Sequence, residues 1–160
     1  MEIIEYEDKY LEDCKDLMVE LEEYIVSIDE DHLDQVGKYY RELIMDINLK
    51  ELEKNEGKCY IAIDNNKAIG LIMGLVVKYD ESDYLDYKCP KKGRITELIV
   101  TKKIRSKGVG KELISKMENY LKNIGCEYIS IEVFAYNKYA IDFYTKGNYH
   151  ARCIDMIKKV

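Results

Sequence analysis

This sequence of 160 residues is poor in the features that mark several protein classes. It has no tryptophan, a single proline and two phenylalanines, and none of its apolar runs approaches the ~20 residues of a membrane span. With only nine glycines and 47% hydrophobic residues, it is unlike collagen-like, low-complexity and disordered chains. A chain of this size buries roughly 70% of the surface that it exposes when unfolded. We therefore expect one globular domain that spans residues 1–160.

The residues that bind metals or form disulfides are also sparse. Five cysteines are an odd number, and they are widely spaced without a C-x-x-C pair, which argues against a disulfide framework and a zinc cluster. His32 and His150 lie far apart and have no neighbouring ligands. We expect no metal site. Residues 1–5 lack the basic start and apolar stretch of a signal peptide, which predicts a cytoplasmic protein.

Acidic residues are concentrated in the first part of the chain. Residues 1–60 carry 19 acidic and 7 basic residues, a balance of −12, whereas residues 61–160 carry a balance of +6. Two explanations fit this division: two solvated helix surfaces, or a basic part that binds an anionic cofactor and an acidic part that faces a cationic substrate. The pI near 5.1 and the absence of a dense Lys/Arg stripe argue against a nucleic-acid partner. The lack of long apolar runs argues against a membrane partner.

Hydrophobic periodicity predicts an α/β domain with helices and strands in mixed order. Apolar residues spaced three and four apart predict a first helix over Tyr10–Ile25. The same spacing predicts a second helix, which begins after the potential N-caps Ser27 and Asp29–Asp31 and ends near Lys54. Later helices are expected over Val109–Ile124 and Asn137–Lys146. The β-rich runs predict strands at Glu2–Tyr6, Cys59–Ile63, Ala68–Lys78, Arg94–Val100, Glu127–Ala135 and Arg152–Ile157. Tyr79–Lys92, which contains the only proline, predicts a long loop.

The segment from Glu97 to Lys111 has the pattern of a phosphate-binding turn. It passes from a strand through a basic glycine turn into a helix. Gly108 and Gly110 lack side chains, so backbone N–H groups can approach an anion at the positive end of the helix. Arg105, Lys107 and Lys111 add positive charge.

Two common phosphate motifs do not fit this segment. A P-loop requires a hydroxyl residue after its lysine, but Glu112 follows Lys111. A dinucleotide-binding fingerprint requires a third glycine where this chain has Leu113. What remains is R-x-x-G-x-G, from Arg105 to Gly110.

A second motif follows downstream. A predicted strand ends in Ile131-Glu132-Val133, and the pattern N-x-x-A-x-x-F-Y and a glycine come after it, at Asn137, Ala140, Phe143, Tyr144 and Gly147. With both motifs in this order, the chain resembles the GNAT superfamily of acetyl-CoA-dependent N-acetyltransferases over essentially its whole length. The resemblance implies a mixed, mostly antiparallel central sheet flanked by helices in a single domain.

The resemblance also implies roles for individual residues. The pyrophosphate of CoA would be bound by backbone N–H groups of the turn, which consists of Arg105, Ser106, Lys107, Gly108, Val109 and Gly110. Lys111 would lie nearby. The pantetheine arm would pair with the backbone of Leu98, Ile99 and Val100, between splayed strands. Asn137 would contact the cofactor, and Tyr144 would protonate the departing thiolate.

The residue that deprotonates the acceptor is left open by the sequence. An ammonium has no lone pair for attack, so it must lose a proton to a base or to water. Glu132 resembles the base of family members that act on protein N-termini, and Glu97 lies on the strand beside the expected thioester. Some members carry an acidic base where this chain has Arg94. Glu132, Glu97 and an ordered water all remain candidates.

The leading hypothesis is transfer of an acetyl group from acetyl-CoA to a primary amine, by direct attack in a ternary complex. The acceptor side would comprise the acidic first helices and the tyrosine-rich loop Tyr79–Lys92, which favours a cationic small-molecule or peptide amine. An acyl-CoA binding or sensing module without turnover, and an N-acyltransferase for a longer acyl-CoA, are the alternatives. A homodimer through the sheet edge or the first helices is a further possibility.

Overall fold

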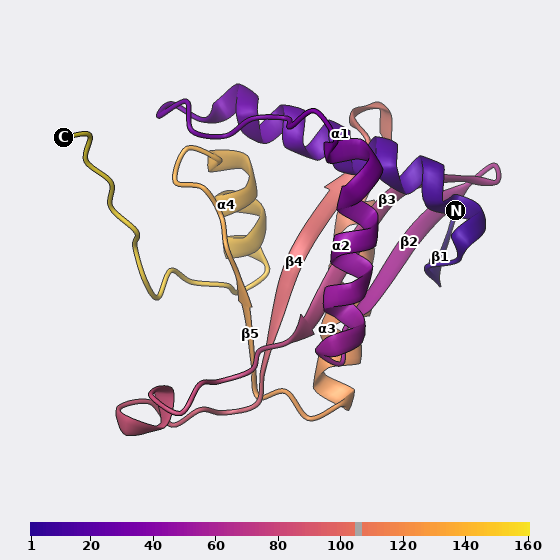
Figure 1. Ribbon diagram of the computed structural model, residues 1–160. Helices are drawn as coiled ribbons and strands as arrows, with labels where there is room; N and C mark the ends of the chain where they lie inside the picture. The colour runs from indigo at the N-terminus through magenta and orange to yellow at the C-terminus, as the bar shows by residue number, and fades with distance from the viewer. Residues whose placement is uncertain (105–106) are drawn as a thin grey trace.

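The computed structural model describes residues 1–104 and 107–160 and contains one five-stranded sheet (Figure 1). The strand order follows the chain, and the first three pairings are antiparallel whereas the last is parallel. The strands are β1 (Glu2–Glu5), β2 (Lys58–Asp64), β3 (Lys67–Val76), β4 (Lys92–Val100) and β5 (Tyr128–Ile131).

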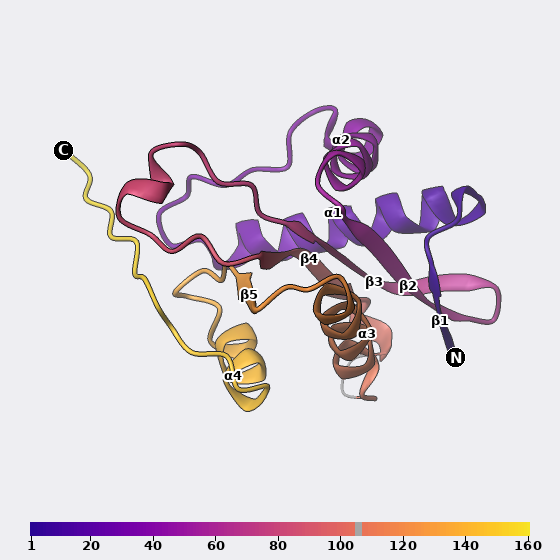
Figure 2. The same cartoon turned by 90° about the horizontal axis from the view of Figure 1, so that it is seen from below.

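Helices cover both faces of this sheet. Helices α1 (Leu11–Ile28) and α2 (Tyr40–Lys54) lie on one face, and α3 (Val109–Asn123) and α4 (Lys138–Lys146) lie on the other (Figure 2). Short 3₁₀ turns occur at Asp8–Tyr10, Asp83–Leu85 and Lys102–Ile104. The predicted mixed, mostly antiparallel sheet flanked by helices is confirmed. Within the described part of the chain, none of the helices has the length and apolar character needed to cross a bilayer.

Each face of the sheet has its own apolar core. Met18 and Met45 pack with Leu71 between the sheet and α1 and α2. Ile72 packs with Leu113 on the opposite face, below α3. Strand β3 therefore contributes to both cores, and nine of its ten residues are buried. Burial on both faces explains why β3 reads as a continuous apolar run rather than an alternating one.

Two glycines allow α3 to lie close to the sheet. A Cβ atom on Gly74 would stand 2.7 Å from Sδ of Met117, and one on Gly93 would stand 2.7 Å from Cδ1 of Leu121. At either separation, a side chain on the strand would require the end of the Met117 or Leu121 side chain to shift. The two glycines thus leave room for the side chains by which α3 packs on the sheet.

The pairing of β4 with β5 stops halfway along β4. It runs from Lys92 opposite Tyr128 to Ile95 opposite Ile131, whereas β4 continues to Val100. The two strands diverge beyond this point (Figure 1). An opening therefore forms on the β5 side of the C-terminal half of β4, as the family resemblance predicts.

A bulge in β4 decides which way its side chains face. Gly74 of β3 is opposite Ile95 and Met73 is opposite Glu97, so Thr96 is an extra residue. As a consequence Ile95 belongs to the core under α3, whereas Ile99 belongs to the core under α1 and α2. Glu97, two residues before Ile99, lies on the α1–α2 face.

Two predicted elements are wrong. Arg152–Ile157 forms no strand, because this segment has no strand beside it within the described residues and is exposed throughout. The second helix begins only at Tyr40, because the Asp29 carboxylate accepts backbone N–H groups of Asp31, Leu33 and Asp34 and holds a loop there. The predicted strand Glu127–Ala135 is shorter than expected and spans Tyr128–Ile131.

Candidate active site

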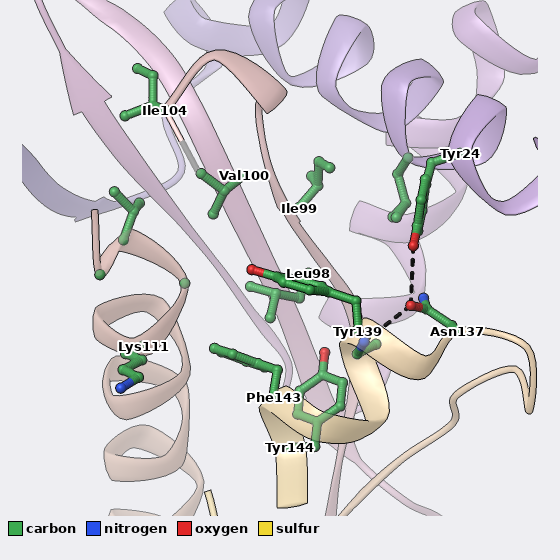
Figure 3. A pocket seen from close by; sticks show the side chains of 15 residues that line it. Tyr24, Leu98, Ile99, Val100, Ile104, Lys111, Asn137, Tyr139, Phe143 and Tyr144 are labelled. Carbon is green, nitrogen blue, oxygen red and sulfur yellow. Dashed lines mark hydrogen bonds between the residues drawn. The ribbon is translucent and has the colours of Figure 1, made fainter. Parts of the chain in front are cut away.

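A cavity of about 360 Å³ lies where β4 and β5 diverge (Figure 3). Its walls come from α1, the second half of β4, the start of α3 and one face of α4. The lining residues are Leu21, Tyr24, Leu98, Ile99, Val100, Ile104, Gly108, Val109, Gly110, Lys111, Asn137, Tyr139, Ala140, Phe143 and Tyr144. Nine of the thirteen site residues predicted from the sequence are in this set.

The N-terminus of α3 forms one end of the cavity. Gly108 precedes the helix with a φ of +86° and provides no capping side chain. The first intrahelical donor is the N–H of Glu112, which bonds to the carbonyl of Gly108, so the N–H groups of Val109, Gly110 and Lys111 have no helical acceptor. These donors lie at the positive end of the helix dipole. An anion could therefore bind there without competing with a cap.

Gly110 keeps this end of the cavity open. A Cβ atom at this position would stand 3.5 Å from Cζ of Phe143 and 3.9 Å from Cγ2 of Val100. Any larger side chain would fill the space between α3 and α4. Lys107 is exposed and does not line the cavity, and Arg105 and Ser106 lie outside the described residues.

Asn137 joins α1 to α4 at the other end. It is buried at the N-cap of α4, where its Oδ1 accepts the N–H of Ala140 at 3.0 Å and the hydroxyl of Tyr24 at 3.2 Å (Figure 3). One oxygen thus caps a helix and ties it to a second helix across the cavity. Asn137 lines the cavity, as expected, while its oxygen also serves the fold.

Tyr144 points its hydroxyl into the cavity (Figure 3). Its ring packs edge-on against Phe143, with 5.2 Å between ring centroids, and against Tyr149 at 5.7 Å. Burial, and then the charge of Glu97, raise the pKa of Tyr144. The hydroxyl therefore stays protonated at neutral pH and is available as a proton donor.

Glu97 lies among polar side chains of α1 and α2. Burial and the charge of Glu22 raise the pKa of Glu97 to about 7, while the amide of Asn48 opposes this shift. Burial and the charges of Glu22 and Glu97 likewise raise the pKa of Tyr40. A carboxyl group with a pKa near 7 can exchange protons at neutral pH.

Glu22 is the second carboxylate of this cluster. Burial raises its pKa, as does the charge of Asp34, and the hydroxyl of Tyr40 opposes the shift. We call Glu22, Tyr40, Asn48 and Glu97 the polar cluster. Two neighbouring, half-buried carboxylates favour binding of a positively charged ligand, since a cation would offset their mutual repulsion.

Glu132 stands apart from the cavity. Its side chain is 83% exposed, pairs with Arg94, and is not among the lining residues. Glu132 directly follows β5, at the point where the pairing of β4 with β5 ends, and Arg94 lies on the paired part of β4. Of the two predicted catalytic residues, Tyr144 lines the cavity and Glu132 does not. Glu97 does not line it either, but its charge contributes to the raised pKa of Tyr144.

Several site residues were not predicted from the sequence. Ala140 and Phe143 were quoted only as parts of a motif, although their spacing places them on the same helix face as Tyr144. Tyr24, Tyr40 and Asn48 carried no signal, because their roles arise from contacts between distant segments. In the described parts of the chain, no group of three or more His, Cys, Asp or Glu residues is placed to hold a metal ion.

Comparison with known families then gives a direct match. Residues 17–148 match the model of the Acetyltransferase (GNAT) family. The chain belongs to this family. The GNAT match includes every residue that lines the cavity, from Leu21 to Tyr144.

Individual relatives agree with this GNAT assignment. An uncharacterized N-acetyltransferase, MJ1530 of Methanocaldococcus jannaschii, is 33% identical over 94 residues, which are 58% of this chain and 53% of that protein. This chain therefore spans about half the length of that curated relative.

Two solved structures show the same fold. A variant of the BH1408 protein from Bacillus halodurans superposes with a TM-score of 0.88 at 17% identity, over 100% of this chain and 99% of that one. The aminoglycoside N-acetyltransferase AAC(6')-Iy, solved in complex with CoA, gives a TM-score of 0.70 at 16% identity, over 99% and 100% of the two chains.

Proposed function

We propose that this protein is an N-acetyltransferase that transfers the acetyl group of acetyl-CoA to a cationic primary amine in a ternary complex. The observation that carries the proposal is the cavity itself, which has unpaired backbone N–H groups of α3 at one end and the hydroxyl of Tyr144 in its wall. Glu97 lies on β4, the strand that forms another wall; burial and Glu22 raise its pKa to about 7, and its charge helps to raise the pKa of Tyr144. Environments that separate the pKa values of two neighbouring groups in this way are typical of acid and base pairs in enzymes.

The cavity fits the parts of acetyl-CoA. Its α3 end offers three backbone N–H donors for the pyrophosphate, and Gly108 and Gly110 leave the approach clear. Arg105, Ser106, Lys107 and Lys111 would add contacts around the phosphates. Leu98, Ile99, Val100 and Phe143 supply an apolar wall for the pantetheine arm, and Asn137 borders it.

Acetyl-CoA supplies an activated acetyl thioester, and the protein supplies the two proton transfers. The Glu97 carboxylate accepts a proton from the ammonium group of the acceptor, so that the amine gains a lone pair for attack. The hydroxyl of Tyr144 donates its proton to the departing thiolate. A tyrosine and a thiol have comparable ordinary pKa values. Burial, which raises the pKa of Tyr144, would also raise the proton affinity of a thiolate in the same cavity, so the transfer stays feasible.

We assign the base role to Glu97 rather than to Glu132. Glu132 is exposed to solvent and its carboxylate is paired with the guanidinium of Arg94. The ion pair with Arg94 occupies the carboxylate, and the side chain is not among those that line the cavity. Glu97 has no such partner among the described residues and lies on the face that carries the polar cluster.

The polar cluster supports a cationic acceptor. Glu22 and Glu97 place two carboxyl groups near each other, and Tyr40 adds aromatic surface beside them. Two of the structural neighbours are named as aminoglycoside acetyltransferases. Polyamines, aminoglycosides and peptide N-termini share this chemistry and form the test panel.

A thermal-shift titration with acetyl-CoA tests whether the N-terminus of α3 binds the cofactor. A ligand at a hundred times its Kd adds about 2.7 kcal/mol, which raises the Tm of a domain of this size by roughly 5 to 10 °C. Gly108→Glu should abolish the shift. Gly125→Glu is the matched control, because Gly125 also has a positive φ of +91° and open space around it, but at the opposite end of α3.

Release of the CoA thiol with each amine then tests turnover. Amine-dependent release supports the acetyltransferase. Binding of acetyl-CoA without release across the panel would contradict it and favour the sensing module, and preferential turnover of longer thioesters would favour a different acyl group. If no acyl-CoA raised the Tm, both the proposed cofactor site at the N-terminus of α3 and the proposed acetyltransferase function would be overturned.

A further inference from the structure

Helix α1 carries two carboxylates that accept hydrogen bonds from the sheet side of the molecule. Asp13 and Glu20 are about two helical turns apart, which places them on the same side of the helix. Oδ2 of Asp13 accepts the backbone N–H of Ala68, near the start of β3, at 2.9 Å. Glu20 uses both of its oxygens: Oε2 accepts the hydroxyl of Thr101 at 2.9 Å, and Oε1 accepts the backbone N–H of Lys102 at 2.7 Å.

The residues that Glu20 contacts lie between β4 and α3. Thr101 follows the last residue of β4, and its backbone N–H bonds to the carbonyl of Ile69. Lys102 begins the 3₁₀ turn that ends at Ile104, whose N–H bonds back to the carbonyl of Thr101. Glu20 therefore holds the point where the chain leaves the sheet on its way to α3.

This point borders the cavity at the end where α3 begins. Ile104, at the end of the same 3₁₀ turn, lines the cavity together with Gly108. Leu21, the residue of α1 that follows Glu20, also lines it. A change in the path of the chain at Lys102 would therefore move a wall of the cavity and the residues that lead into α3.

Helix α1 also holds the opposite wall of the cavity. The hydroxyl of Tyr24, one helical turn after Glu20, donates to Oδ1 of Asn137 at the N-cap of α4 (Figure 3). One side of α1 thus contacts both the segment before α3 and the start of α4. These are the two parts of the chain between which the cavity lies.

The charge of Glu20 gives a way to separate its possible effects on an anionic cofactor. A carboxylate beside this end of the cavity repels an anion, so its removal would by itself strengthen binding. A carboxylate also accepts stronger hydrogen bonds than a neutral oxygen does, so it holds Thr101 and Lys102 more firmly. Loss of that hold would weaken binding, and the two effects therefore have opposite signs.

We propose that Glu20 is a positioning residue for the cofactor. It holds Thr101 and Lys102 so that the chain enters α3 in the orientation in which the N-terminus of the helix binds the pyrophosphate of acetyl-CoA. The inference rests on the proposed function, because it requires acetyl-CoA to bind at this end of the cavity. It assigns to Glu20 an effect on the affinity for acetyl-CoA and none on the chemical step.

Glu20→Ala and Asp13→Ala form a matched pair that tests this role. Each variant removes one carboxylate of α1 with its hydrogen bonds, and each should lower the Tm by a few degrees. Only Glu20→Ala should weaken acetyl-CoA binding, with a rise in Kd of roughly tenfold, although it removes a negative charge. Isothermal titration calorimetry measures the Kd. In turnover, the KM for acetyl-CoA should rise in Glu20→Ala while kcat stays the same.

Two further variants test the same contact with smaller changes. Thr101→Val keeps the shape of the side chain and removes one donor to Glu20, so the Kd should rise severalfold. Glu20→Gln keeps one oxygen acceptor and should restore part of the affinity that Glu20→Ala loses. Because Thr101→Val and Glu20→Ala remove the same hydrogen bond, their effects on the Kd should not be additive in the double variant.

The outcomes separate this inference from the proposed function. If the natural protein binds no acetyl-CoA, the proposed cofactor site fails and the inference fails with it. If the natural protein binds acetyl-CoA and Glu20→Ala binds it as tightly or more tightly, only the positioning role is overturned. An equal rise in Kd for Asp13→Ala would also overturn it, since the loss would then follow from reduced stability alone.

Discussion

At the residue scale, the carboxyl group of Glu97 combines the proposed role of base with a cost in stability. It is the strand residue with a pKa raised to about 7, and the causes are burial and the nearby charge of Glu22. A buried carboxyl group whose charged form is destabilised by the fold is more often retained for function than for stability.

Glu97→Gln should therefore stabilise the protein above neutral pH. Between the ordinary pKa of 4.5 and the raised value of about 7, the folded state binds more protons than the unfolded state. The free energy of unfolding of the natural protein thus falls as the pH rises through this window, by up to about 3 kcal/mol. We expect the variant to have a higher Tm than the natural protein at pH 8 and an equal Tm at pH 4. Thermal denaturation at both pH values measures this difference.

Glu132→Gln is the matched control for that measurement, since Glu132 is exposed and paired with Arg94. It should give no such gain at pH 8. If Glu97→Gln were no more stable than the natural protein at pH 8, the raised pKa of Glu97 would be refuted.

The same titration governs catalysis. If Glu97 is the base, kcat/KM rises about tenfold per pH unit below pH 7 and levels off above it. Glu97→Gln should lower kcat/KM by roughly 10²- to 10⁴-fold and remove this rise. The pH profiles of the natural protein and of Glu132→Gln should coincide. A pH-dependent loss confined to Glu132→Gln would return the base role to that residue.

Tyr144→Phe tests the proton donor. The change keeps the ring that packs between Phe143 and Tyr149 and removes only the hydroxyl. We expect kcat to fall by roughly 10²-fold or more while the affinity for acetyl-CoA stays the same. Tyr149→Phe is the control, because its hydroxyl bonds to Glu118 away from the cavity. An unchanged kcat in Tyr144→Phe would show that solvent protonates the thiolate.

At the scale of elements, the site depends on how α4 is held against α1. The single oxygen of Asn137 accepts both the N–H of Ala140 and the hydroxyl of Tyr24. Helix α4 has nine residues, too few to be stable alone, so its cap and its packing must hold it in place.

Asn137→Ala should cost about 1 kcal/mol of stability from the lost cap alone. We also expect weaker binding of acetyl-CoA, because α4 forms a wall of the cavity. Asn137→Asp keeps an oxygen acceptor at the cap and should restore most of the stability. Denaturant titration and the acetyl-CoA thermal shift measure the two effects. Equal stability of all three proteins would exclude the capping role.

At the scale of the whole molecule, charge is divided between the acidic residues 1–60 and the basic remainder. This division favours a cationic acceptor on the α1–α2 face and an anionic cofactor at the start of α3. Salt should weaken the long-range part of both attractions, because the screening length falls to about 3 Å at 1 M ionic strength.

We therefore expect the KM for a triamine to rise several-fold between about 0.05 and 0.5 M salt. The KM for a monoamine of similar length should change much less, since fewer charges contribute. Initial rates at saturating acetyl-CoA separate this effect from cofactor binding. Equal salt dependence for the two amines would contradict an acidic acceptor site.

Much of this molecule could be predicted from local sequence. The turn from Gly108 to Lys111, the order of the elements and the motif that carries Tyr144 are encoded in consecutive residues, because caps, dihedral preferences and helix periodicity act over short distances. These features led to the family and to nine residues of the cavity wall.

Tertiary structure decided where Glu97 lies and whether the last predicted strand forms. The bulge at Thr96 turns Glu97 toward α1 and α2, and only there do burial and Glu22 raise its pKa. The segment Arg152–Ile157 has the composition of a strand but no strand beside it among the described residues, and strand formation requires a partner that local sequence cannot provide. The sequence by itself thus determined the glycine turn before α3 and the helix motif that carries Tyr144, whereas contacts between distant segments decided the surroundings of Glu97 and Glu132.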